Sequence, residues 1–227
     1  MSIYEPIESN DSRRHLQLRS PVTLERTGEL VCANAEDVAS AIARARAAQP
    51  AWAATSMKER AAIVERALQI VLARQDEIID TVVKETGKAR TDAMSMEVFS
   101  VADQLCYYAK NAEKFLAPRK RKVHGILGLM KQLRILYKPL GVVGLITPWN
   151  LPLYLLSWKT APALAMGNAV VAKPSELTPM SGSALGDIIL SFDRTGYRRH
   201  ARHFHAADLA VSLRGTTVLV TGANSGL

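Results

Sequence analysis

The sequence predicts an α/β fold in which amphipathic helices precede a doubly wound layer of strands and helices. Two short apolar runs, 141–146 and 169–172, have the length and composition of buried parallel strands. A helical pattern follows each run, over 151–166 and 179–189. The order strand, helix, strand, helix builds a parallel sheet covered by helices. We therefore expect a doubly wound α/β layer here.

Helical signals begin at residue 34. Asn34 has the residue type of an N-cap, with Asp37 three positions on, and Pro50 is expected to end this first helix. Ser56 and Glu59 have the spacing of a capping box, which predicts the start of a second helix.

Two more helices and a strand arm are expected next, one helix ending at Gly87 and one stopping before Pro118. Their buried stripes are Ile78, Ile79, Val82 and Val83 in the first, and Met96, Phe99, Leu105, Tyr108 and Ala112 in the second. From Leu133 the apolar period changes to two, which predicts a strand paired with part of Lys120–Leu129. Residues before 34 are expected to form an irregular polar arm with short extended pieces.

Composition, cysteine count and charge indicate which class of protein this chain belongs to. The chain has 227 residues, 48% of them hydrophobic and 22% charged, and no run of eighteen apolar residues, so a globular protein is expected and a membrane protein is not. The N-terminus lacks the pattern of a secretory signal, and two cysteines, Cys32 and Cys106, favour a reducing, cytoplasmic setting. The net charge of +8 is concentrated in 13–15, 119–122 and 194–205. These clusters show no regular interleaved aromatic pattern and no binding-motif spacing, so we expect solvated faces rather than nucleic-acid binding.

Three polar residues follow the two apolar strands. Asn150 comes just after the first, where its amide could donate to a developing oxyanion or cap the next helix, and position alone favours the cap. Lys173 and Glu176 follow the second strand, where they could bind ribose hydroxyls or form a surface ion pair. Spacing alone favours the ion pair.

The segment from Leu140 to Pro179 nevertheless resembles the aldehyde dehydrogenase superfamily. PWN at 148–150 is similar to the motif whose Asn helps to form the oxyanion hole, and AKPSE at 172–176 is similar to the segment whose Lys and Glu hold the adenosine ribose. ETGK and the order of helices and arm extend the resemblance to about 20–189. It implies Asn150 as a catalytic residue. The cofactor-binding residues that it implies are Ile146, Thr147, Pro148, Trp149, Lys173, Ser175 and Glu176. A Glu at 176 would repel a 2′-phosphate, so NAD is favoured over NADP.

The same resemblance implies chemistry that needs other residues. In this family a cysteine thiolate attacks the aldehyde and a Glu activates water, and both come after the point where the resemblance stops. Cys32 and Cys106 lie in no such motif, so a structural role is expected for each. We therefore expect the chain not to oxidise aldehydes alone. Tyr154 and Trp158 either line a substrate entrance or pack in the core.

The tail LRGTTVLVTGANSGL resembles the start of a short-chain dehydrogenase/reductase, with a junction between the two resemblances near 189–192. Thr221, Gly222 and Gly226 match its pyrophosphate loop, although an ordinary strand and turn is the alternative. Without the helix that follows this loop, phosphate binding is expected to be weak. The strand at 217–220 is expected to cover the apolar edge of the strand at 169–172, which the exposure of Val170 and Val218 would test.

These observations predict a truncated aldehyde-dehydrogenase-like Rossmann-type fold with N-terminal helices and a β arm. The parts are an N-terminal arm (1–33), helices of a cofactor-binding domain (34–117), an oligomerisation-like β arm (118–139), the first strands and helices of the NAD-binding layer (140–189), and a basic linker with the reductase-like strand and loop (190–227). We expect an NAD(P)-dependent aldehyde dehydrogenase-like oxidoreductase that takes an aldehyde where the catalytic half is present. The alternatives are a non-catalytic oligomerising or nucleotide-binding module, joined to itself or to full-length relatives, and a truncated short-chain reductase.

Overall fold

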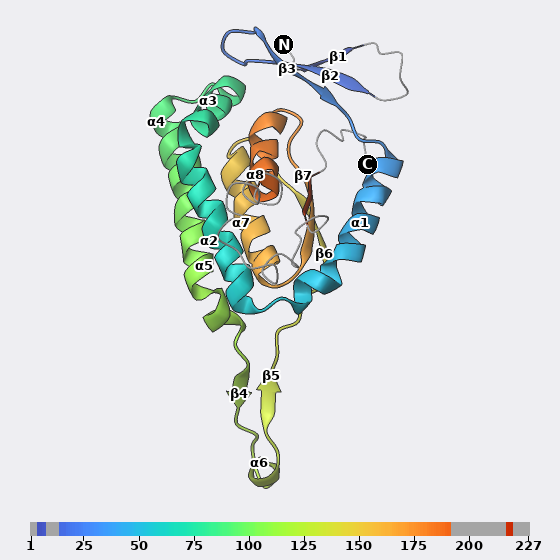
Figure 1. Ribbon diagram of the computed structural model, residues 1–227, viewed down its shortest axis with the longest axis vertical. Coiled ribbons are helices and arrows are strands. Elements are labelled where there is room, and N and C mark those ends of the chain that lie inside the picture. Colours follow the sequence, from blue (N-terminus) through green and yellow to red (C-terminus); the bar gives the residue numbers. More distant parts are fainter. Residues whose placement is uncertain (1–3, 8–13, 192–216, 220–227) are drawn as a thin grey trace, which may run out of the picture.

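The computed structural model describes residues 4–7, 14–191 and 217–219, with side-chain environments for 14–126 and 128–185 (Figure 1). The reductase-like residues Thr221, Gly222 and Gly226, and most of the basic linker, lie outside the described residues.

The N-terminal segment forms an antiparallel sheet of β1 (Tyr4–Ile7), β2 (His15–Arg19) and β3 (Arg26–Val31), in that order. The short extended pieces expected here are therefore confirmed, but they pair in a regular sheet, so the expectation of an irregular arm is wrong. The sequence HLQLR alternates, so Leu16 and Leu18 turn to one face and are buried with Leu30 and Cys32. This small core holds the sheet together.

The first helices begin as predicted but the first ends later. α1 (Ala35–Ala54) and α2 (Met57–Ala73) start with capping boxes, Asn34 with Asp37 and Ser56 with Glu59, which confirms both caps. Pro50 lies inside α1 and does not end it, so that prediction is wrong. The turn after Pro50 is held from outside, because the buried Trp52 donates from Nε1 to the carbonyl oxygen of Leu164 at 3.0 Å. A tertiary contact thus outweighs the cost of proline in a helix.

The next helices end where the sequence predicts. α3 (Gln75–Thr86) stops at Gly87, which has a left-handed φ of 73°. α4 (Arg90–Asp92), the π-helical η1 (Ala93–Phe99) and α5 (Ser100–Leu116) run on to just before Pro118.

The buried stripe predicted for this long helix is partly wrong. Met96 and Phe99 are 51% and 67% exposed, whereas Glu97 and Val98 are 0% and 1% exposed. The wider π-helical turn rotates the side chains away from the α-helical stripe. The π-helical turn thereby places the side chain of Glu97 in the core.

A β arm projects from the body of the molecule (Figure 1). β4 (Arg119–Arg121) pairs antiparallel with β5 (Leu133–Ile135), which confirms the predicted pairing, and the short α6 (Leu127–Met130) lies between them. The side chains of Ile126, Leu129 and Met130 are 79%, 86% and 75% exposed.

The central sheet is parallel, with the order β6 (Val142–Ile146), β7 (Ala169–Lys173) and β8 (Thr217–Leu219). β8 pairs with the edge of β7 and Val170 is 0% exposed, so the prediction that this strand covers β7 is confirmed for the backbone; the side chain of Val218 lies outside the described environments. The expectation that β6 is buried is wrong, because within the described sheet it has a neighbour on one side alone, and Ile146 is 77% exposed.

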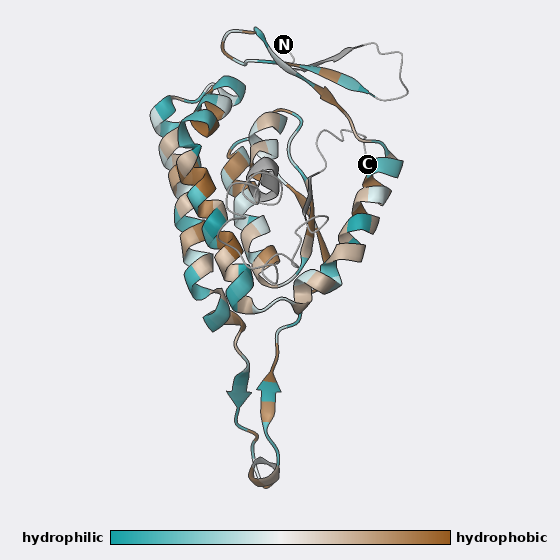
Figure 2. Ribbon diagram, viewed as in Figure 1, coloured by the Kyte–Doolittle hydropathy of each residue, from teal (hydrophilic) through white to brown (hydrophobic). Residues whose placement is uncertain are grey.

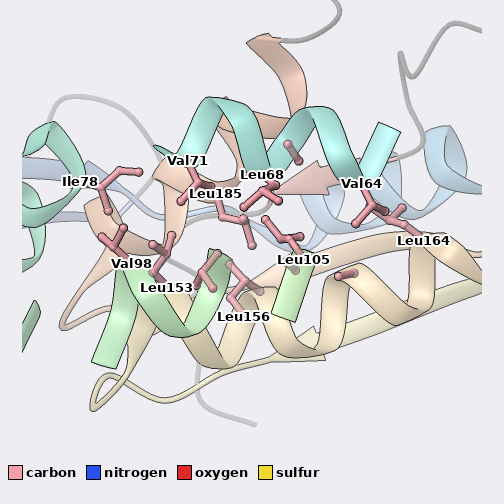
Figure 3. Packing of buried hydrophobic residues seen from close by; sticks show 14 of the residues in the cluster. Val64, Leu68, Val71, Ile78, Val98, Leu105, Leu153, Leu156, Leu164 and Leu185 are labelled. Carbon is pink, nitrogen blue, oxygen red and sulfur yellow. The ribbon is translucent and has the colours of Figure 1, made fainter. Parts of the chain in front are cut away.

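Helices cover both faces of this sheet. α1 lies against one face, while α7 (Pro152–Ala165) and α8 (Pro179–Ser191), which confirm the two predicted helices, lie against the other (Figure 1). α2 and α5 pack outside α7, and hydrophobic and hydrophilic residues are interspersed along both helices (Figure 2). The core between these helices includes Val64, Leu68, Leu105, Leu153, Leu156 and Leu185 (Figure 3). Among the described helices none has the length and hydropathy to cross a bilayer.

Candidate functional site

The segments that follow β6 and β7 meet at the carboxyl edge of the sheet. Ile146 lies opposite Lys173 in the parallel register, and the backbone N–H of Thr147 donates to the carbonyl oxygen of Lys173 at 3.2 Å. Open α/β sheets bind ligands at this edge. The structure therefore brings Ile146 and Thr147, at the start of the first segment, next to Lys173, at the start of the second.

Lys173 and Glu176 form an ion pair, with Nζ 3.2 Å from Oε2. Both side chains are partly exposed, by 26% and 24%. Burial raises the pKa of Glu176, but its own backbone N–H, the Lys173 ammonium and the charge of Arg14 outweigh burial, so the pKa lies below its ordinary value. The predicted ion pair between Lys173 and Glu176 is thus present in the structure. Because both side chains are partly exposed, a ligand could reach their polar atoms.

Two hydroxyl residues near this pair have different roles. Thr147 is 3% exposed, and its Oγ1 has no hydrogen-bond partner among the described residues. Ser175 is 7% exposed, and its Oγ accepts from the backbone N–H of Leu177 at 3.2 Å. Ser175 therefore shapes the turn that carries Glu176, while the hydroxyl of Thr147 still needs a partner.

The remaining residues of the first segment present apolar surface. Ile146 and Trp149 are 77% and 55% exposed, and Pro148 is also exposed. Large apolar groups beside a few convergent polar atoms are typical of small-molecule sites.

Asn150 does not cap α7, so the interpretation that position alone favoured is wrong. The N-cap is Leu151, which makes no side-chain cap, and the backbone N–H groups of Leu153 and Tyr154 donate instead to Oε2 of Glu97, at 3.2 and 3.0 Å. The buried carboxylate of Glu97 provides the acceptor that a cap residue would supply. The exposed side-chain amide of Asn150 makes no hydrogen bond within the described part of the chain.

Sequence reasoning missed the two residues that hold this loop. Lys88 donates from Nζ to Oε1 of Glu97 at 2.5 Å and to the carbonyl oxygen of Asn150 at 2.7 Å. A charged residue next to Val98 and Val101 on a helix was the available signal for Glu97, but the π-helical turn hid its position on the buried face.

The aldehyde dehydrogenase family profile matches residues 7–193, most of the chain. The chain belongs to the aldehyde dehydrogenase family. This is a family of NAD(P)-dependent oxidoreductases, and its fold agrees with the α/β class that the sequence predicts.

Individual aldehyde dehydrogenases are similar to this chain in sequence and in structure. A Mycolicibacterium smegmatis protein named "Putative succinate-semialdehyde dehydrogenase [NADP(+)]" is 39% identical over 183 residues, covering 81% of this chain and 35% of its own. An aldehyde dehydrogenase of Mycobacterium tuberculosis, solved with NAD+, is 30% identical with a TM-score of 0.76, over 95% of this chain and 40% of its own. An NAD-dependent benzaldehyde dehydrogenase of Corynebacterium glutamicum is 30% identical with a TM-score of 0.76, over 96% and 43%. The chain thus spans less than half the length of these relatives.

Other residues of this aldehyde dehydrogenase chain lie away from the sheet edge or at its margin. Cys32 is in the small N-terminal core, and Cys106 packs from α5 against the main core. Tyr154 packs partly against the core and stacks edge-on with Trp158, with centroids 4.9 Å apart, while Trp158 is 49% exposed. The described residues contain no cluster of His, Cys, Asp and Glu suited to a metal ion.

Proposed function

We propose that this chain is the cofactor-binding part of an NAD-dependent aldehyde dehydrogenase and carries its oxyanion donor. The observation that supports this most strongly is the meeting of three features at one sheet edge. They are the Lys173–Glu176 pair, which is partly exposed, and two groups without a hydrogen-bond partner in the described part of the chain, the buried hydroxyl of Thr147 and the side-chain amide of Asn150.

The residues present fit a dinucleotide. Lys173 can donate to a ribose hydroxyl and Glu176 can accept from the adjacent hydroxyls, each exchanging its mutual contact of 3.2 Å for the ligand. Ile146, Pro148 and Trp149 offer apolar surface to the cofactor, Thr147 offers its hydroxyl, and Ser175 holds the turn. The bound nicotinamide would accept a hydride from the substrate.

Glu176 favours NAD over NADP in this proposal. Its pKa is lowered, so the carboxylate is charged at neutral pH and would repel a 2′-phosphate. The relative from M. smegmatis is named for NADP, whereas one solved relative is named for NAD and the other was solved with NAD+. The relatives therefore do not decide between the two cofactors, and the proposal depends on Glu176.

Asn150 would act on an aldehyde rather than on the cofactor. Its amide N–H would donate to the oxygen that becomes negative when a nucleophile adds to the carbonyl carbon. Cys32 and Cys106 are packed in other parts of the fold, so neither is the proposed nucleophile. We therefore expect residues 1–227 to bind cofactor without oxidising aldehydes by themselves, and to need the thiol and the base from elsewhere.

Further parts of the proposal concern partners and location. The exposed arm of β4, β5 and α6 would join copies of the chain or full-length relatives, and the location would be cytoplasmic. Trp158 would line the substrate entrance. Binding of pyrophosphate by Thr221, Gly222 and Gly226 also remains a proposal, since these residues lie outside the described ones.

The test is a titration of the chain with NAD, with tryptophan fluorescence as the readout. Trp149 is exposed at the site, whereas Trp52 is buried, so NAD should quench a Trp149 signal that Trp149→Phe removes. Trp158→Phe is the matched control. A flat titration that calorimetry confirms would reject the proposal.

A further inference from the structure

Lys88 and Glu97 connect the loop of Asn150 to the helical layer. Lys88 follows Gly87, the left-handed residue that ends α3, and its ammonium contacts the Glu97 carboxylate and the Asn150 carbonyl at 2.5 and 2.7 Å. The side chains of Lys88 and Glu97 are 19% and 0% exposed. This ion pair is therefore mostly withdrawn from water, where hydrogen-bond geometry is held more tightly than on a surface.

The same carboxylate also holds the other side of the loop. Its second oxygen, Oε2, accepts from the backbone N–H groups of Leu153 and Tyr154, in the first turn of α7. The backbone is thus fixed at Asn150 by Lys88 and at 153–154 by Glu97, with Leu151 and Pro152 between. A short segment held at both ends has little freedom to rotate.

The side chain of Asn150 is the part of this loop left free. It is exposed, it does not cap α7, and it has no hydrogen-bond partner among the described residues. An amide that must meet a developing oxyanion needs to be within reach of it before the reaction begins. Because this amide makes no contact of its own among the described residues, the position from which it can reach the oxygen is set by the backbone that carries it.

We propose that Lys88 and Glu97 are positioning residues, which hold the backbone of Asn150 at a place from which its amide reaches the reacting oxygen. This inference rests on the proposed role of Asn150 as oxyanion donor. Lys88 and Glu97 act only through Asn150 and its neighbours. Their charges oppose each other, so the pair orients the loop while adding little net charge to the site.

The alternative is that the pair stabilises the fold without affecting the amide. Removal of Lys88 alone would leave a buried carboxylate without its cation and could unfold the chain. The double variant Lys88→Met with Glu97→Gln removes both charges, and Glu97→Gln alone keeps an acceptor for α7. Arg90→Met is the matched control, because Arg90 forms exposed ion pairs with Asp76 and Asp80.

The experiment measures Asn150 directly by NMR in the whole chain. Its signals are assigned by their loss in Asn150→Asp. In Lys88→Met and in the double variant, the carbonyl carbon of Asn150 should shift upfield as its donor is lost. The heteronuclear NOE of the Asn150 backbone N–H should fall below the wild-type value, since a loop that loses the contact at its carbonyl moves more freely on the ps–ns timescale. Glu97→Gln should lower the same NOE, and Arg90→Met should change neither signal.

Each outcome decides the inference. An unchanged carbonyl shift in the folded variants would mean that the contact from Lys88 is absent, and an unchanged backbone NOE after a carbonyl shift would mean that the contact does not hold the loop at Asn150. Either result overturns the proposal. NAD titration of the same samples is read separately, so a wild-type chain that fails to bind NAD would reject the proposed function while the NMR result still reports on positioning.

Discussion

The carboxylate of Glu85 on α3 lies 2.6 Å from the backbone nitrogen of Ser181 on α8, and also accepts from the Ser181 hydroxyl and the backbone N–H of Met180. Glu97 holds the first turn of α7 in the same way. Both helices that follow strands at the site therefore have their N-terminal N–H groups bound by buried carboxylates. These N-termini are not open to a phosphate, although helix N-termini commonly bind one.

Glu85 gives the stability of the fold a pH dependence. Burial is the largest effect and raises its pKa, although hydrogen bonds from Ser181 and Met180 and the charge of Lys84 act in the opposite direction. A carboxyl group with a raised pKa binds more protons in the folded state. Its contribution to stability is full below the unfolded pKa of 4.5 and is lost as the pH rises through the higher folded pKa.

Glu85→Gln should remove this pH-dependent loss of stability. Urea unfolding gives the free energy of unfolding of each protein at each pH. We expect the value for the wild type minus the value for Glu85→Gln to decrease as the pH rises from about 4.5, the direction set by linkage. Glu176, whose pKa is lowered, gives the opposite slope, because its contribution is lost as the pH falls through its folded pKa. A difference curve that is flat, or that rises with pH, would contradict the role given to Glu85.

Glu176→Gln should change the choice of cofactor. The variant loses the charge that accepts from the ribose and repels a 2′-phosphate, so NAD binding should weaken by about tenfold, as expected for a charged hydrogen bond. NADP binding should tighten in the same variant. Calorimetric titration with both cofactors measures this, and Glu29→Gln, on the N-terminal sheet, is the control. Equal losses for NAD and NADP would show that Glu176 does not discriminate.

The sequence predicts the elements of the fold better than their environments. The caps at Asn34 and Ser56 and the stop at Gly87 depend on nearby residues, so local patterns suffice. The continuation of α1 past Pro50 depends on a contact from Trp52 to Leu164, which no local pattern contains.

The same distinction applies to the site. Strand order alone predicts that Asn150, Lys173 and Glu176 follow the carboxyl ends of their strands, and in the structure the two segments begin side by side at that edge. Lys88 and Glu97 were missed, because their relation to Asn150 joins residues far apart in the chain. The exposure of β6 was also missed, because an apolar strand gives no sign of which neighbours it has.

Gly87→Ala should destabilise the chain through two separate effects. Gly87 has a φ of 73°, and a Cβ there would lie 2.6 Å from Cγ2 of Val22. A left-handed conformation costs a non-glycine residue about 1–2 kcal/mol, and the clash adds to it. Gly125→Ala is the matched control, because Gly125 has a φ of 74° and open space around its Cβ position. Urea unfolding should show a larger loss for Gly87→Ala, whereas equal losses would mean that contact with Val22 is unimportant.

The arm gives a prediction about assembly. Its tip exposes Ile126, Leu129 and Met130, while the segment 118–140 contains lysine and arginine but no acidic residue. Two arms brought together would repel each other, so association through them must come from apolar contact and should strengthen as salt screens the charges. Light scattering should therefore show a larger mass at higher ionic strength.

Leu129→Gln with Met130→Gln should weaken that association. Both side chains are largely exposed in the single chain, at 86% and 75%, so the melting temperature should stay the same. If both are buried on assembly, each contributes about 1.5–3 kcal/mol, and the dissociation constant should rise at least about a hundredfold. Met96→Gln with Phe99→Gln, at exposed positions on the body, is the matched control. A monomeric wild type at high salt, or a control that dissociates as readily as the arm variant, would place the interface elsewhere.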